Sequence, residues 1–254
     1  MTGGIVEITL VCTVLLGAAL QRIAGMGFAM VVAPFAVLLL SGQQGVVFAN
    51  LCGAIAAIAL IWPVRADIDR KRLIILTGMS VVGAFAGALV VRGLDVGVFR
   101  IVVGSILLAG IVASLLLGRT RHVVPVTPAT FVAGGATGML VTMSGIGGPP
   151  MSIYAVATRW EHHRFAATMQ PFVALSSLIG AGAVLSSTPD AVPQLSLTVW
   201  VLVGIALASG LIGGQLLHHR VPAKWGRAVV IVLGIIGAVT TITSGITIVS
   251  GAGA

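Results

Sequence analysis

Uninterrupted apolar runs of about 20 residues follow one another along almost the whole chain and limit it to folds that bury helices in lipid. A helix needs about 20 apolar residues to cross a bilayer. Six runs meet this length: Gly45–Val64, Leu73–Val91, Val98–Gly118, Phe165–Leu185, Leu195–Leu217 and Trp225–Ser244. The connections between them are short, and none is large enough for a soluble domain. We therefore expect an all-α, multi-pass integral membrane protein.

The balance of residue types excludes a water-soluble fold and a nucleic-acid-binding function. Only 8% of the 254 residues are charged and 58% are hydrophobic, whereas soluble domains contain about 25% charged residues. The net charge of +8 comes from short basic clusters between the apolar runs, a pattern typical of loops beside anionic lipid. We therefore predict the lipid bilayer as a partner, and no nucleic acid.

The two cysteines and the N-terminal stretch carry no special signal. Cys12 and Cys52 lie inside apolar runs without the spacing of metal ligands, so we interpret them as small hydrophobic residues and expect no metal and no cofactor. The first 20 residues have no basic n-region and no Ala-x-Ala-like cleavage site. We take them as part of the mature protein.

Two further apolar regions are each interrupted by glycine. In residues 5–40 the break is Gly25-Met26-Gly27-Phe28, and in residues 128–158 it is Ser144-Gly145-Ile146-Gly147-Gly148 followed by two prolines. Glycine permits a sharp backbone turn, and proline suits the first turn of a returning helix. We predict two broken or re-entrant helix pairs besides six full spans, which makes eight to ten segments; ten short spans fit the sequence equally well.

The breaks recur at a nearly constant offset, which indicates two copies of one unit. Pairs that lie 120 residues apart are Gly25/Gly145, Gly27/Gly147 and Asn50/Gln170. Pairs that lie 127 residues apart are Gly83/Gly210, Gly87/Gly214 and Arg100/Arg227. The order of this set predicts a first repeat over 2–120 and a second over 128–246, which together form one transport domain.

The basic residues predict that the two repeats are inverted. The connection Arg65–Arg72 holds four basic residues, whereas its counterpart Ser186–Ser196 holds none. The next pair shows the opposite bias, since Gly93–Gly97 holds none and His218–Arg227 holds three. Because basic loops face the cytoplasm, matched connections lie on opposite sides of the membrane. We expect a cell (inner) membrane location with both termini outside.

Interrupted helices at corresponding positions of inverted repeats indicate a transport site near the bilayer midplane. Each break is followed by a helix whose first N–H groups and positive dipole end would point into the gap, and such ends bind anions. The residues expected to contact a small anionic substrate are Arg22, Gly25, Met26, Gly27, Phe28, Asn50, Ser144, Gly145, Ile146, Gly147, Gly148 and Gln170.

Each kind of candidate also has a purely structural interpretation. The glycines could allow close helix packing and the amides could bond neighbouring helices. The Ser144 hydroxyl could bond a carbonyl of its own helix. Arg22, just before the first break, could extend to the membrane surface instead of entering a cavity.

The two glycine-broken openings, Gly25–Phe28 and Gly145–Pro149, resemble the sulfite exporter TauE/SafE family of membrane permeases. The resemblance covers nearly the whole chain in length, repeat arrangement and motif position. The first copy departs from the glycine-rich form at Phe28 and Ala29. The resemblance implies export of sulfite, sulfonates and related sulfur-containing anions, whereas the residues alone predict only a small anion.

The positions of the titratable residues bear on energy coupling. Apart from Glu7 near the N-terminus, the acidic residues and histidines lie in or beside connections, so a proton relay inside the membrane is unsupported. We therefore hypothesise uniport driven by the membrane potential. This arrangement also disfavours an intramembrane enzyme, because the hydroxyl of Ser144 has no base nearby.

Two alternatives to a transporter remain open. An anion channel would use the same glycine breaks and charges. A non-transporting membrane scaffold would leave the paired breaks unexplained.

Overall fold

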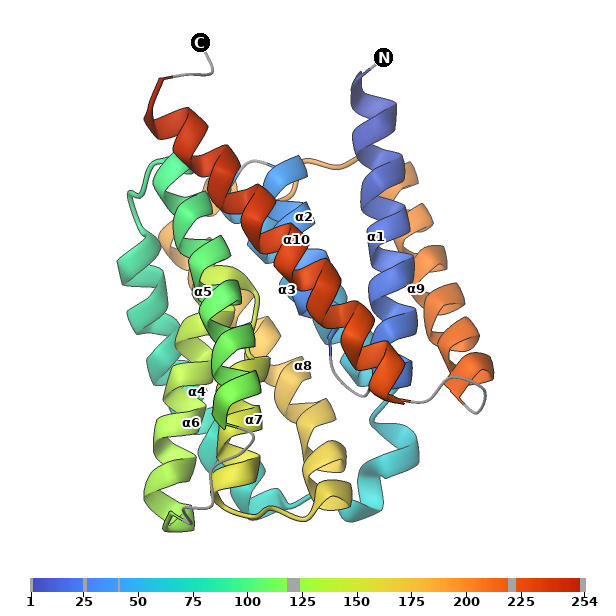
Figure 1. Ribbon diagram of the computed structural model, residues 1–254, viewed down its shortest axis with the longest axis vertical. Helices are drawn as coiled ribbons and strands as arrows, with labels where there is room; N and C mark the ends of the chain where they lie inside the picture. Colours follow the sequence, from blue (N-terminus) through green and yellow to red (C-terminus); the bar gives the residue numbers. More distant parts are fainter. Residues whose placement is uncertain (1, 25–26, 41, 118–123, 219–222, 252–254) are drawn as a thin grey trace.

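The computed structural model describes residues 2–24, 27–40, 42–117, 124–218 and 223–251, and within these ranges the regular structure is entirely helical. In chain order the elements are α1 (Thr2–Ala24), α2 (Phe28–Leu39), α3 (Gln43–Ala59), η1 (Trp62–Asp67), α4 (Arg70–Val91), α5 (Val96–Leu117), α6 (Val126–Ser144), α7 (Gly148–Ala157), α8 (His162–Ser187), η2 (Pro189–Ala191), α9 (Leu197–His218) and α10 (Ala223–Val249). They form one bundle with both termini at the same end (Figure 1). The all-α prediction is confirmed.

Seven of the described helices have the length and composition to cross a membrane: α1, α4, α5, α6, α8, α9 and α10. Their outer faces carry large apolar side chains such as Ile74, which is 70% exposed, and Leu197, which is 79% exposed. Apolar surface on this scale is stable against lipid and not against water. The protein is therefore a multi-pass membrane protein.

The spans differ in detail from those expected. Of the six predicted runs, Gly45–Val64 is not one helix, because α3 ends at Ala59 after 17 residues and the chain continues as the 3₁₀ helix η1. Conversely, the opening helix of each broken pair is long enough to cross, since α1 has 23 residues and α6 has 19. The short members of the two pairs are α2, with 12 residues, and α7, with 10.

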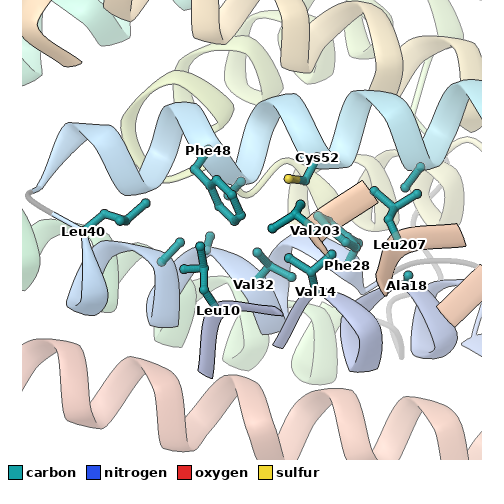
Figure 2. Close-up of a cluster of buried hydrophobic side chains, with 14 of the residues drawn as sticks. Leu10, Val14, Ala18, Phe28, Val32, Leu40, Phe48, Cys52, Val203 and Leu207 are labelled. Carbon is teal, nitrogen blue, oxygen red and sulfur yellow. The ribbon is translucent and has the colours of Figure 1, made fainter. Parts of the chain in front are cut away.

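The two short helices α2 and α3 lie inside the bundle. Figure 2 shows their apolar side chains, including Phe28 and Phe48, packed against Val14 of α1 and Val203 of α9. Phe28, Val14 and Phe48 are at most 2% exposed. A helix that ends at membrane depth must be surrounded by protein, because lipid cannot satisfy its free backbone groups. The core therefore keeps the end of α2 away from lipid.

Two long helix pairs are built on the same small-residue contact. A Cβ at Gly83 of α4 would overlap the carbonyl oxygen of Gly135 in α6, and a Cβ at Gly210 of α9 would overlap that of Leu15 in α1. Gly83 and Gly210 are 127 residues apart, and Leu15 and Gly135 are 120 apart. These are the offsets of the predicted repeats, and the match recurs one turn further along both pairs.

A second matched contact joins the two halves of the chain. Gly110 of α5 lies against the ring of Pro149 in α7, and Gly237 of α10 lies against the ring of Pro34 in α2. In Figure 1, α1 begins at the end that carries the termini and α6 begins at the opposite end, and α4 and α9 are opposed in the same way. These contacts and directions support the inverted repeats 2–120 and 128–246, which remain a proposal.

Candidate functional site

Both glycine breaks line one cavity between α1, α3, α6 and α8. Gly27, Phe28, Ala29 and Met30 line it from the first break, and Gly145–Pro149 line it from the second. Its volume is about 110 Å³, which is room for several water molecules or one small oxyanion. The predicted site residues Gly25 and Met26 lie outside the described residues.

The backbone at the two breaks requires glycine. Gly27, which precedes α2, has a φ of 137°, and Gly145, which ends α6, has a φ of 76°. Residues with a Cβ rarely adopt positive φ. At Gly145 the turn lets its N–H donate to the carbonyl of Val141 at 2.8 Å, which closes the last turn of α6.

The N-terminus of α2 faces the cavity with its donors free of helical bonds. The first backbone bond of this helix runs from the N–H of Val31 to the carbonyl of Gly27, at 3.2 Å. The N–H groups of Phe28, Ala29 and Met30 therefore have no partner within the helix, and no side chain caps this end. All three residues line the cavity, so the positive end of the helix dipole lies beside it.

The N-terminus of α7 faces the same cavity with different chemistry. Gly147 precedes the helix without a side-chain cap, but Pro149 and Pro150 in its first turn have no N–H to donate. A Cβ at Gly148 would meet nothing within 4 Å, whereas one at Gly147 would lie 2.7 Å from the methyl of Thr137. Gly148 therefore borders open space, and Gly147 is needed for close packing.

Uncharged polar side chains complete the lining. They are Gln21, Thr137, Ser152, Gln170, Ser176 and Ser177. Thr137 is 1% exposed, and its hydroxyl has no hydrogen-bond partner among the described residues. An unpaired buried polar group costs about 1–3 kcal/mol, so this hydroxyl is placed to bond a molecule in the cavity.

Sequence reasoning missed Gln21 and Thr137. Both occur singly within apolar helices, and neither has a matched polar partner at the 120-residue offset that singled out Asn50 and Gln170. Only the packing of α1 and α6 decides that these side chains lie at the cavity.

The structure brings seven of the twelve predicted site residues into the lining. They are Gly27, Phe28, Gly145, Ile146, Gly147, Gly148 and Gln170. Of the others, Ser144 donates its hydroxyl to the carbonyl of Leu140 in its own helix, at 2.8 Å. It does not line the cavity.

Asn50 and Arg22 also lie outside the lining. The Asn50 side-chain amide donates to the Val141 carbonyl at 3.1 Å, which ties α3 to the end of α6. Arg22 donates through Nε to the side-chain oxygen of Gln215 on α9. The described contacts of both residues are thus with neighbouring helices.

The family model of the sulfite exporter TauE/SafE matches residues 10–241. The chain belongs to the TauE/SafE family. The matched range contains both breaks and every residue of the cavity lining. TauE/SafE is a family of transporters, so this membership assigns the chain to membrane anion transport. No curated protein and no solved structure matches the chain.

The cavity of this TauE/SafE protein is suited to an anion without any basic side chain. Within the described residues its lining carries no formal charge. Two helix N-termini and several amide and hydroxyl groups surround a largely apolar space, in which such dipoles act more strongly than in water. A small oxyanion can therefore exchange its hydration shell for these donors.

Proposed function

We propose that the protein is a secondary transporter that exports small sulfur-containing anions, such as sulfite or organosulfonates, across the cell membrane. The substrate binds in the cavity between the α1–α2 and α6–α7 breaks. The observation that carries this proposal is the meeting of two uncapped helix N-termini at one cavity. Helix N-termini bind anions, and paired breaks in a membrane bundle are typical of transport sites.

The proposal includes a topology. The two repeats place the basic segment around η1 and the start of α8 at the end opposite to the termini (Figure 1). With this basic end in the cytoplasm, both termini lie outside. Accessibility tags at Asp67 and Asp190 test this, because they must report opposite compartments. Labelling from the same side would contradict the inversion.

The proposal also includes the driving force. The described lining holds no acidic side chain and no histidine, so the cavity offers no residue for proton coupling. The membrane potential alone favours anion export from a negative interior by about 2.3 kcal/mol per charge for each 100 mV. Sulfite flux in proteoliposomes should follow an imposed voltage and persist without a pH gradient. Flux that follows the pH gradient at clamped voltage would contradict uniport.

The decisive experiment for the cavity is Gly148→Val. Because a side chain at this position points into open space, valine fills the cavity without displacing protein atoms. We expect sulfite flux to fall about 100-fold while thermal stability is unchanged. Gly147→Val is less informative, because a Cβ there would lie 2.6 Å from Val141 and disturb the fold.

The matched control is Gly182→Val on α8. Gly182 is exposed and a Cβ there also meets nothing within 4 Å, so this variant should transport normally. Normal flux in Gly148→Val would show that the anion binds elsewhere. Saturable, exchange-stimulated flux indicates a carrier, and single-channel currents would indicate a pore instead.

A further inference from the structure

At the basic end of the bundle, Arg72 and Trp160 carry buried donors that no described group satisfies. Nη1 of Arg72 and Nε1 of Trp160 are both buried without a hydrogen-bond partner. Trp160 is 8% exposed, and the side chain of Arg72 is 19% exposed. The guanidinium carbon of Arg72 lies 4.3 Å from the centre of the Trp160 ring. The two unpaired donors thus belong to one stacked pair.

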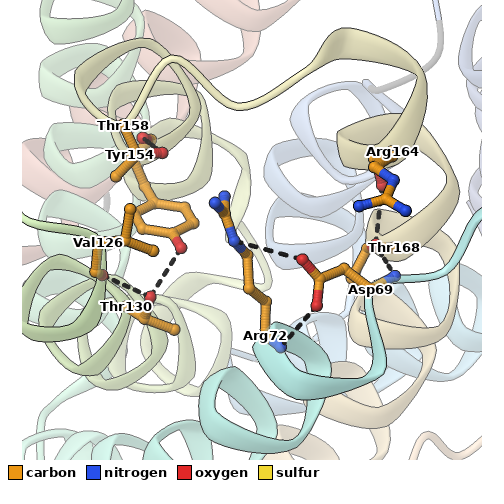
Figure 3. A network of polar contacts seen from close by, with 8 residues as sticks. All are labelled: Asp69, Arg72, Val126, Thr130, Tyr154, Thr158, Arg164 and Thr168. Atoms are coloured by element: carbon orange, nitrogen blue, oxygen red, sulfur yellow. Dashed lines mark hydrogen bonds and ion pairs between the residues drawn. The ribbon is translucent and has the colours of Figure 1, made fainter.

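The neighbouring acceptors are already engaged. Figure 3 shows the Arg72 guanidinium between the Tyr154 ring and the Asp69 carboxylate. One oxygen of Asp69 accepts from the backbone N–H of Arg72 at 3.1 Å, and the other faces Arg72 Nε at 3.4 Å. The Tyr154 hydroxyl is paired with Thr130 at 2.7 Å. Neither Asp69 nor Tyr154 is therefore the partner of the unpaired donors.

The last carbonyls of α7 are engaged as well. Those of Tyr154, Ala155 and Val156 accept the backbone N–H groups of Thr158, Trp160 and Arg159. The carbonyl of Ala157 accepts the N–H of Val124 at 3.0 Å. Buried donors, charged ones above all, are normally paired, so the arrangement calls for an acceptor that comes from outside the described chain.

The chemistry of this corner selects an anion. It offers one delocalised positive charge, two N–H donors and an aromatic wall formed by Trp160 and Tyr154. The segments beside it add Arg70, Lys71 and Arg164. Guanidinium groups prefer oxyanions, because their planar N–H donors match the oxygen atoms.

We propose that Arg72 and Trp160 form a second binding site, for a small sulfur or phosphorus oxyanion, at the basic end of α7 and separate from the central cavity. Met169 packs in the same apolar cluster as Tyr154 and Trp160, and it also lines the central cavity. The two sites are therefore separated by one side chain. If the proposed function holds, this is the position that a substrate anion occupies before it reaches the cavity.

The test is a titration of the full-length protein, labelled with ¹⁵N-indole tryptophan, in lipid nanodiscs. The chain has four tryptophans, and Trp160→Phe assigns the Trp160 N–H resonance. We expect sulfate and sulfite, but not chloride at equal ionic strength, to shift this resonance saturably. Arg72→Lys should weaken the response at least tenfold, and Arg72→Gln should abolish it. The measurement on the unaltered protein does not depend on how the variants fold.

Two outcomes would overturn the proposal. A Trp160 resonance that ignores oxyanions would show that only a buried water pairs these donors. A response that Arg72→Gln leaves intact would place the anion elsewhere. Gly148→Val separates this inference from the proposed function: its flux tests the cavity, while its Trp160 resonance should respond as in the unaltered protein.

Discussion

The α1–α2 break and the α6–α7 break line the same cavity, yet they bring different groups to it. The first break supplies backbone N–H groups from Phe28, Ala29 and Met30 at the start of α2. The second replaces two of the equivalent donors by Pro149 and Pro150 and adds the unpaired Thr137 hydroxyl. Two breaks that match in sequence position therefore differ in chemistry: the first is the main source of donors, and the second is the more rigid wall.

The largest expected difference between the breaks is in backbone strain. Gly27→Ala should destabilise the protein by roughly 3 kcal/mol or more, because a φ of 137° suits only glycine and the new Cβ would lie 2.8 Å from Val230. Gly145→Ala, at a φ of 76°, should cost only about 1–2 kcal/mol. Thermal unfolding in detergent measures both, with Gly182→Ala as the control. Equal losses would show that the two turns are equally constrained.

The next effect concerns the donors of α2. Ala29→Pro gives this helix the proline pattern of α7 and removes one N–H from the cavity, so sulfite binding should weaken about 10- to 100-fold. The reverse change, Pro150→Ala, adds a donor to α7 and should leave binding unchanged or strengthen it about threefold. KM values in proteoliposomes report both. If Ala29→Pro keeps its KM at normal protein yield, α2 does not hold the anion.

A smaller effect is expected for the hydroxyl on the other side. Thr137→Val keeps the shape of the side chain but removes its hydroxyl, so KM should rise about tenfold if the hydroxyl bonds the substrate. Stability should hold or increase, because an unpaired buried group is lost. A fall in melting temperature with an unchanged KM would instead assign the hydroxyl a structural partner.

The smallest effect is expected at Arg22, close to the first break in sequence but bonded to Gln215 on α9. Arg22→Gln should change the KM for sulfite less than about twofold, since the guanidinium does not line the cavity. Initial rates over a range of sulfite concentrations measure it. A tenfold loss would mean that this side chain turns toward the substrate during transport.

Local features of the sequence were sufficient for most of the architecture. The apolar runs predicted an all-α membrane bundle because lipid admits few other folds. The positions of the breaks were predictable from Gly27, Gly145 and Pro149, because conformational freedom and a missing N–H are properties of single residues. The 120- and 127-residue offsets led to the helix contacts at Gly83 and Gly210.

The tertiary structure decided which side chains meet. It ended α3 at Ala59, turned Thr137 and Gln21 to the cavity, and placed Arg72 against Trp160. Hydropathy reports only that a residue lies in the membrane, because every face of a buried helix is apolar. The direction in which a lone polar residue points depends on the rotation of its helix against neighbours distant in the chain. That rotation is set by packing, which no local pattern records.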